Sequence, residues 1–180
     1  MHEARIEDTD AGRLPADDGW FILNLDEIGW RTIPGNGTWC IFESPNAPSP
    51  TLGIGVHILA PGEPNGHYHR ESDQEGFLVI AGECLAIVEG QERRIRTWDY
   101  LHCPPGTTRI TLGAGDEPCA ILMVGTRTPH STTHYPADPV AARHGAAVAV
   151  ATNSAREAYA GRPPSQPARS PWPLSRAAQA

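Results

Sequence analysis

Short strand-like segments, either apolar or alternating between polar and apolar residues, recur along the middle of the chain and constrain its fold more than any other feature. They lie at residues 77–81, 84–88, 92–97, 100–103, 108–112 and 119–124. Turns rich in glycine and proline separate them, such as Gly82-Glu83, Glu89-Gly90 and Pro104-Pro105-Gly106. Strands of this length joined by tight turns are typical of antiparallel sandwiches and barrels. The chain shows no alternation of strands with helices, so we predict an all-β domain.

The two ends of the chain differ from this central part. Residues 1–19 are charged and small, and we expect a flexible N-terminal arm there. We expect the β-barrel to cover residues 20–126 and a C-terminal extension to cover residues 127–180. The end of the extension is rich in Pro, Ala, Ser and Arg, a composition that favours an extended or disordered tail.

Helix-start signals in the extension predict two short helices. Asp138 followed by Pro139 is typical of an N-cap with proline at the first helical position, and Gly145 indicates the end of that helix. Ser154 and Glu157 form a capping box for the second helix.

Composition excludes several classes of partner. A formal net charge of −7 argues against nucleic acid and anionic membranes as binding partners. No apolar run approaches the roughly 18 residues of a membrane-spanning helix, and the polar N-terminus lacks a signal-peptide core. The four cysteines have no C-x-x-C spacing and lie singly in apolar segments, which favours buried free thiols. We therefore expect a cytoplasmic protein.

The stretch from Gly62 to Gly82 carries the residues best suited to chemistry. His67 and His69 are one residue apart, and Glu75 precedes the apolar run 77–81. On a strand, residues i and i+2 point to the same face about 6.6 Å apart, so two imidazoles can aim at one point. Imidazole and carboxylate groups are common ligands of transition metals.

This stretch resembles the first signature of the cupin superfamily: Gly, a spacer, His-x-His, a short spacer, Glu, six residues and Gly. The later segment W-D-Y-L-H-C-P-P-G-T-T-R resembles the second cupin signature, and its Asp99, Pro104 and Gly106 match conserved positions of that signature. Trp98 stands where glycine is usual, and Arg109 stands where the family has its last histidine ligand. The resemblance implies a single cupin barrel, a jelly-roll-like double-stranded β-helix, with short helices in the extension.

The resemblance also implies a metal site. His67, His69 and Glu75 would hold one divalent ion, with iron, manganese, nickel or zinc as candidates. The spacer between His69 and Glu75 is one residue longer than usual, and the usual spacing would select Gln74. Because Glu75, Phe77 and Val79 alternate on one strand face, we take Glu75 as the ligand and keep Gln74 as an alternative ligand or substrate contact.

Arg109 leaves two outcomes open. A guanidinium stays protonated and cannot bind a metal, so Arg109 either clamps a carboxylate or phosphate of a substrate beside a three-ligand metal site, or pairs with Glu75 in a metal-free site. His57 and His102 are further candidates for substrate contacts, each with a structural hydrogen bond as its alternative.

The leading functional hypothesis is a metal-dependent enzyme that acts on a small polar or anionic substrate, with a non-haem dioxygenase as one candidate. The alternatives are a metal-free ligand-binding or structural cupin, and an isomerase, epimerase or decarboxylase that uses the same pocket. No catalytic residue is assigned. Family resemblance and a sheet edge that needs cover lead us to expect a homodimer.

Overall fold

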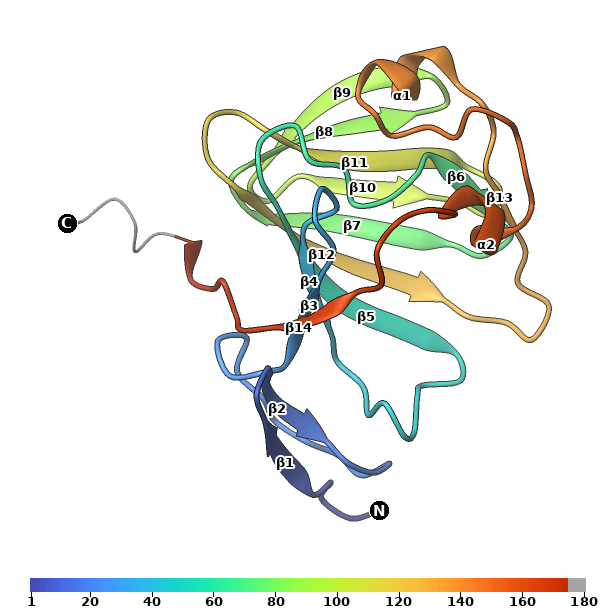
Figure 1. The fold of residues 1–180 in the computed structure, drawn as a ribbon. Coiled ribbons are helices and arrows are strands. Elements are labelled where there is room, and N and C mark those ends of the chain that lie inside the picture. The colour runs from blue at the N-terminus through green and yellow to red at the C-terminus, as the bar shows by residue number, and fades with distance from the viewer. Residues whose placement is uncertain (175–180) are drawn as a thin grey trace.

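The computed structural model describes residues 1–174 and is built around two antiparallel sheets that face each other (Figure 1). One sheet has seven strands in the order β10 (Tyr100–Cys103), β7 (Glu75–Ala81), β12 (Cys119–Thr126), β5 (Leu52–Leu59), β4 (Thr38–Ile41), β3 (Trp30–Thr32) and β14 (Gln166–Ala168). The other has five strands in the order β13 (Thr133–His134), β6 (His69–Glu71), β11 (Thr108–Ala114), β8 (Glu83–Val88) and β9 (Gln91–Arg96). The predicted all-β fold is confirmed.

Alternation along the strands produces the core between the sheets. Phe77 and Val79 of β7 are buried, and they pack with residues from both sheets because every second side chain of a strand points to the same face. The cluster contains Leu59, Phe77, Val79, Cys84, Cys103, Cys119 and Ile121. All four cysteines of the chain are free and buried, as predicted from their spacing.

The N-terminal residues form structure where a flexible arm was expected. Strands β1 (Ile6–Thr9) and β2 (Gly12–Pro15) pair as an antiparallel hairpin. Gly12 has a φ of 135°, and a Cβ at this position would lie 2.6 Å from the carbonyl oxygen of Glu27. Glycine thus lets the hairpin lie directly against the chain near Glu27, so the prediction of a loose arm over residues 1–19 is wrong.

The two predicted helices of the extension are confirmed, together with their caps. In α1 (Pro139–Arg143) the side chain of Asp138 accepts a hydrogen bond from the Ala141 amide at 2.8 Å. In α2 (Ala155–Ala158) the hydroxyl of Ser154 accepts one from the Glu157 amide at 3.3 Å. These contacts satisfy amide groups that the helix itself leaves free.

The extension also completes both sheets. It supplies β13 to one and β14 to the other, and β14 pairs with β3. Trp172 packs against the cluster of Ile28, Trp30 and Val56 on the outer side of the larger sheet. Residues 175–180 of the predicted tail lie outside the described residues. Among residues 1–174, no helix has the length and apolar character needed to cross a membrane.

Candidate functional site

Four polar side chains from the signature stretches meet between the sheets. His69 and Glu71 lie on β6, Glu75 begins β7, and Arg109 lies on β11. The pairing of β11 with β6 places Arg109 directly opposite His69. We call His69, Glu71, Glu75 and Arg109 the signature centre.

Arg109 is the cation of the signature centre, and its side chain is only 3% exposed. Its Nη2 contacts a carboxylate oxygen of Glu75 and lies 3.7 Å from Oε2 of Glu71. Its Nη1 donates a hydrogen bond of 3.1 Å to the carbonyl oxygen of His69. The guanidinium therefore has two carboxylate partners within the protein, which matches the ion-pair alternative for Arg109 and Glu75.

His69 extends this pairing. Its Nδ1 lies 2.6 Å from the carbonyl oxygen of His67, and its Nε2 lies 3.3 Å from Oε1 of Glu71. The hydrogen bond from His69 is the main cause that lowers the pKa of Glu71, and the charge of Arg109 adds to it. The result is a continuous series of polar contacts from His69 through Glu71 and Arg109 to Glu75.

His67 lies outside the signature centre. Its ring centroid is 4.9 Å from that of Tyr159, and its Nδ1 accepts a contact of 3.4 Å from Nη2 of Arg162. Burial and the nearby charge of Arg162 lower the pKa of His67. The residue precedes β6, which begins at His69, so the strand rule that would align the two imidazoles does not apply to it.

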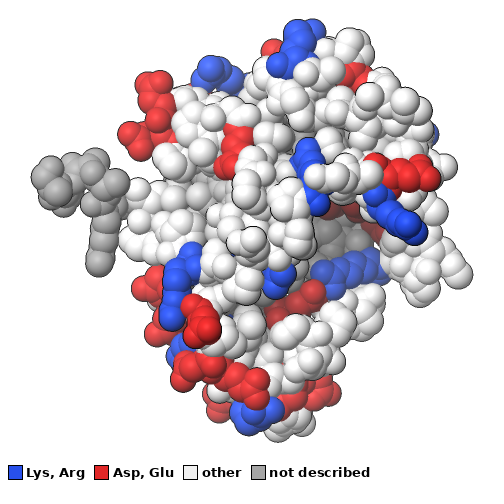
Figure 2. Space-filling model, viewed as in Figure 1, with Lys and Arg blue, Asp and Glu red and all other residues white. Residues whose placement is uncertain are grey.

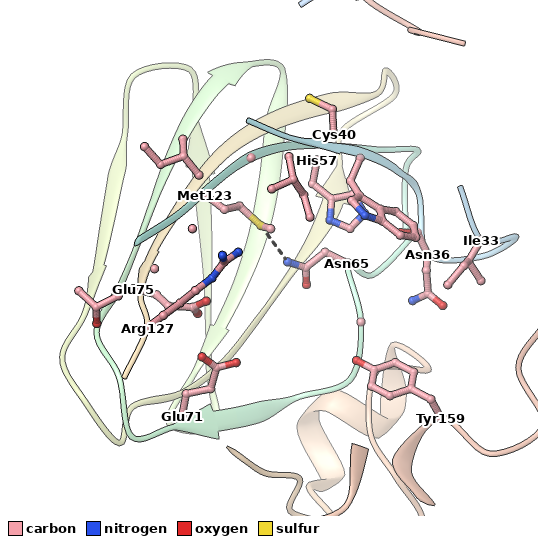
Figure 3. A pocket seen from close by; sticks show the side chains of 18 residues that line it. Ile33, Asn36, Cys40, His57, Asn65, Glu71, Glu75, Met123, Arg127 and Tyr159 are labelled. Carbon is pink, nitrogen blue, oxygen red and sulfur yellow. Dashed lines mark hydrogen bonds between the residues drawn. The ribbon is translucent and has the colours of Figure 1, made fainter. Parts of the chain in front are cut away.

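A cavity of about 500 Å³ adjoins the signature centre (Figure 3). Glu71 and Glu75 reach its wall, and Asn65, His57 and Tyr159 line it as well. The apolar part of the wall consists of Ile33, Trp39, Ile41, Ile54 and Met123. In the space-filling view, acidic and basic side chains lie side by side around a hollow on the face that is turned to the viewer (Figure 2). The volume is that of a small-molecule site.

Comparison with protein families agrees with this geometry. A family model described as a cupin domain matches residues 55–125, which run from within β5 to within β12 and include the whole signature centre. Residues 55–125 are a cupin domain. No curated protein matches the sequence significantly.

Solved structures similar to this chain include proteins with several activities. One is a sugar phosphate isomerase from Silicibacter pomeroyi, with 24% identity over 49% of this chain and 63% of that chain and a TM-score of 0.46. A DMSP lyase from Ruegeria pomeroyi has 21% identity over 54% of this chain and 50% of that chain, with a TM-score of 0.46. A salicylate 1,2-dioxygenase from Pseudaminobacter salicylatoxidans has 28% identity over 43% of this chain and 22% of that chain, with a TM-score of 0.39. The match thus spans less than two thirds of the length of each of these proteins.

Glu71 is the residue of the centre that the sequence prediction missed. In this cupin domain the pair two residues apart that reaches the centre is His69 and Glu71, while the predicted pair was His67 and His69. Five residues separate His69 from Glu75 and three separate Glu71 from Glu75, so neither spacer has the usual length. The spacing alone therefore does not select Glu71, and its place in the centre follows from the pairing of β6 with β11.

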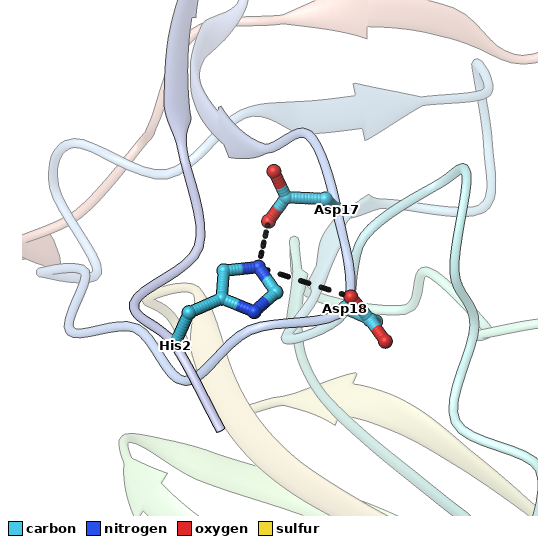
Figure 4. Close-up of side chains that lie close together, drawn as sticks. All are labelled: His2, Asp17 and Asp18. Carbon is cyan, nitrogen blue, oxygen red and sulfur yellow. Dashed lines mark ion pairs between the residues drawn. The ribbon is translucent and has the colours of Figure 1, made fainter.

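The predicted metal-ligand set does not fit this arrangement. His67 lies against Tyr159 and Arg162, and the carboxylate of Glu75 is in contact with Arg109. Within residues 1–174, three or more ligand-type side chains gather within 4.8 Å only at His2, Asp17 and Asp18, which flank the N-terminal hairpin (Figure 4). These three residues are solvent-accessible and take no part in the signature centre. The assignment of His67, His69 and Glu75 as metal ligands stays a prediction without geometric support.

The predicted substrate contacts divide into two groups. His57 is buried and lines the cavity, with its Nε2 2.7 Å from the carbonyl oxygen of Asn36. Gln74 and His102 are exposed and do not line the cavity. His102 lies on β10 next to the buried Cys103, and strand alternation turns it outward, whereas Gln74 precedes β7.

Proposed function

We propose that this cupin binds a small organic molecule in the cavity between its sheets and does so without a bound metal ion. The observation that carries the proposal is the position of Arg109, which is buried between Glu71 and Glu75. A guanidinium has no lone pair for a metal, and its charge repels a cation from the carboxylates that it contacts.

The signature centre then acts as a preorganised part of the binding wall. The carboxylates of Glu71 and Glu75 are held by Arg109 and His69, and both also reach the cavity. A Cβ at position 125 would lie 3.3 Å from Oε1 of Glu75, so Gly125 leaves this oxygen uncovered by a side chain. Groups held in place before binding lose little freedom when a ligand arrives.

Metal analysis of the wild type tests the proposal. Protein purified without an affinity tag should contain much less than one metal ion per chain. Calorimetric titration with Fe(II), Mn(II), Ni(II) and Zn(II) should show no tight binding at the signature centre.

The variant Arg109→His should acquire a metal site. It removes the fixed charge and adds an imidazole beside Glu71, Glu75 and His69, so uptake of divalent metal should appear for the first time. Arg94→His is the matched control, because Arg94 pairs with Glu83 at the surface, with a side chain that is 65% exposed. This control should bind no more metal than the wild type.

One ion per chain in the wild type would contradict the proposal. It would support the metal-dependent enzyme instead, and comparing activity with and without oxygen would then separate an oxygenase from an isomerase, epimerase or decarboxylase. The homodimer stays a prediction, and light scattering of the full chain tests it.

A further inference from the structure

The polar groups on the cavity wall fall into two classes, and this division indicates the chemistry of the ligand. The charges on or beside the wall have partners of opposite charge: Arg109, beside the cavity, contacts Glu71 and Glu75, and Arg127 lies 2.7 Å from Glu43. Nε of Arg109 has no hydrogen-bond partner among the described residues, but it faces a smaller pocket beside the signature centre. The neutral groups His57, Asn65 and Tyr159 are incompletely paired, and we call them the neutral wall. The inference below rests on the proposed function, since it names the ligand of the same cavity.

His57 offers an acceptor to the cavity. Its Nε2 faces the carbonyl oxygen of Asn36 at 2.7 Å, and a carbonyl only accepts, so Nε2 carries the proton. Nδ1 is then a lone-pair acceptor, and no residue among 1–174 donates to it. Burial lowers the pKa of His57 to about 4, which keeps the ring neutral at pH 7.

Tyr159 offers a donor. Its Oη accepts a hydrogen bond of 3.1 Å from the backbone amide of His67, and its own proton has no acceptor within the described chain. Arg162 lies 5.2 Å from the ring centroid of Tyr159 and also bonds the side chain of Asn36. These contacts fix Tyr159 at the cavity although it lies outside the cupin domain.

Two neutral side chains that line the smaller pocket beside the signature centre, Asn65 and Thr111, are poorly satisfied. Asn65 directs its Nδ2 at the sulfur of Met123 over 3.5 Å, and a thioether is a weak acceptor. Thr111 is fully buried, and its Oγ1 has no partner in the described residues. Buried polar groups normally have partners, so a ligand or water is expected to supply them here.

We propose that the cavity takes an uncharged hydroxyl compound with an apolar body, whose hydroxyl groups donate to Nδ1 of His57 and accept from Oη of Tyr159. The apolar body would pack on Trp39, Ile41 and Ile54. A charged ligand would meet no unpaired opposite charge on the wall, because Glu71 and Glu75 already contact Arg109, and Arg127 already pairs with Glu43. This chemistry replaces the anionic substrate expected from Arg109.

Three probes of equal size test the ligand class. The alcohol 3-phenylpropanol, the carboxylate 3-phenylpropanoate and the cation 3-phenylpropylammonium share one apolar body and differ in the polar end. Calorimetry with the full chain in the presence of a chelator should show that the alcohol binds at least tenfold more tightly than either ion. Tighter binding of an ion would overturn this inference and leave the proposed function intact. Binding of none of the three would count against both.

Matched variants test the role of Tyr159. Tyr159→Phe removes one hydroxyl from the cavity and should weaken alcohol binding roughly 3- to 10-fold, the usual range for one net hydrogen bond. Tyr100→Phe removes the same group from the exposed edge strand β10 and should leave binding unchanged. Circular dichroism establishes that both variants fold. Equal alcohol affinity in the wild type and in Tyr159→Phe would overturn the inference.

Discussion

The signature centre and the neutral wall border the same cavity and bury polar groups in opposite ways. In the signature centre, Arg109 is paired with Glu71 and Glu75, and His69 is hydrogen-bonded on both ring nitrogens. In the neutral wall, one nitrogen of His57 and the hydroxyl proton of Tyr159 have no partner among residues 1–174.

This difference separates stability from ligand binding. A buried charge that is already paired resists change, because removing its partner leaves an uncompensated ion. An unpaired neutral group costs less to bury and can still form a hydrogen bond with a ligand. Changes in the signature centre should therefore affect folding most, and changes in the neutral wall should affect binding most.

The largest effect is expected for Arg109→Met. The variant leaves Glu71 and Glu75 buried together without their cation, so the free energy of unfolding should fall by about 3–5 kcal/mol. Urea denaturation followed by tryptophan fluorescence measures it. Adding Glu75→Gln should recover part of the loss, and a single-variant loss below about 1 kcal/mol would show that the ion pair is not buried in solution.

The next effect is a pH dependence from His57. Its folded-state pKa is about 4 against an ordinary value of 6.5, so the unfolded chain takes up a proton first as the pH falls. The stabilisation is complete above pH 6.5 and is lost between pH 6.5 and 4, by about 3 kcal/mol. The free energy of unfolding of the wild type and of His57→Gln, measured between pH 6.5 and 4, isolates the contribution of His57. The variant should lack this part of the pH dependence. Glu71 has a lowered pKa, so the stability that it contributes is lost only at lower pH.

A smaller effect is expected for Gly66→Ala. A Cβ at position 66 would lie 2.7 Å from Oη of Tyr159, so the variant should displace this ring and cost about 1 kcal/mol or somewhat more. Affinity for 3-phenylpropanol should fall with it. In the background of Tyr159→Phe, the same substitution should be nearly neutral for stability, because the atom that the methyl group meets is gone. An equal cost in both backgrounds would contradict this contact.

The smallest effect is expected for Arg94→Met. Arg94 and Glu83 form an ion pair of 2.8 Å on the surface, with side chains 65% and 39% exposed. Water screens this pair, so its loss should change stability by less than about 1 kcal/mol. A cost as large as that of Arg109→Met would remove the distinction between buried and exposed pairs.

Local patterns in the sequence were sufficient for most of the fold. The glycine and proline turns and the alternating apolar residues predicted the all-β domain, and the caps at Asp138 and Ser154 predicted both helices. Each of these signals acts over a few residues, so it can be read along the chain. The N-terminal hairpin was missed because it depends on contacts of Gly12 with residues near Glu27.

The candidate site depended on the sequence and on the tertiary structure. The sequence determined that His69, Glu75 and Arg109 belong to the signature stretches, and the chemistry of guanidinium made an ion pair with Glu75 one of two outcomes. The tertiary structure decided that Glu71 replaces His67, because pairing with β11 begins β6 at His69. It also brought Tyr159 to the cavity from 92 residues beyond His67. Contacts of this kind arise from the packing of segments that are distant in the chain, and no local pattern in a single sequence specifies them.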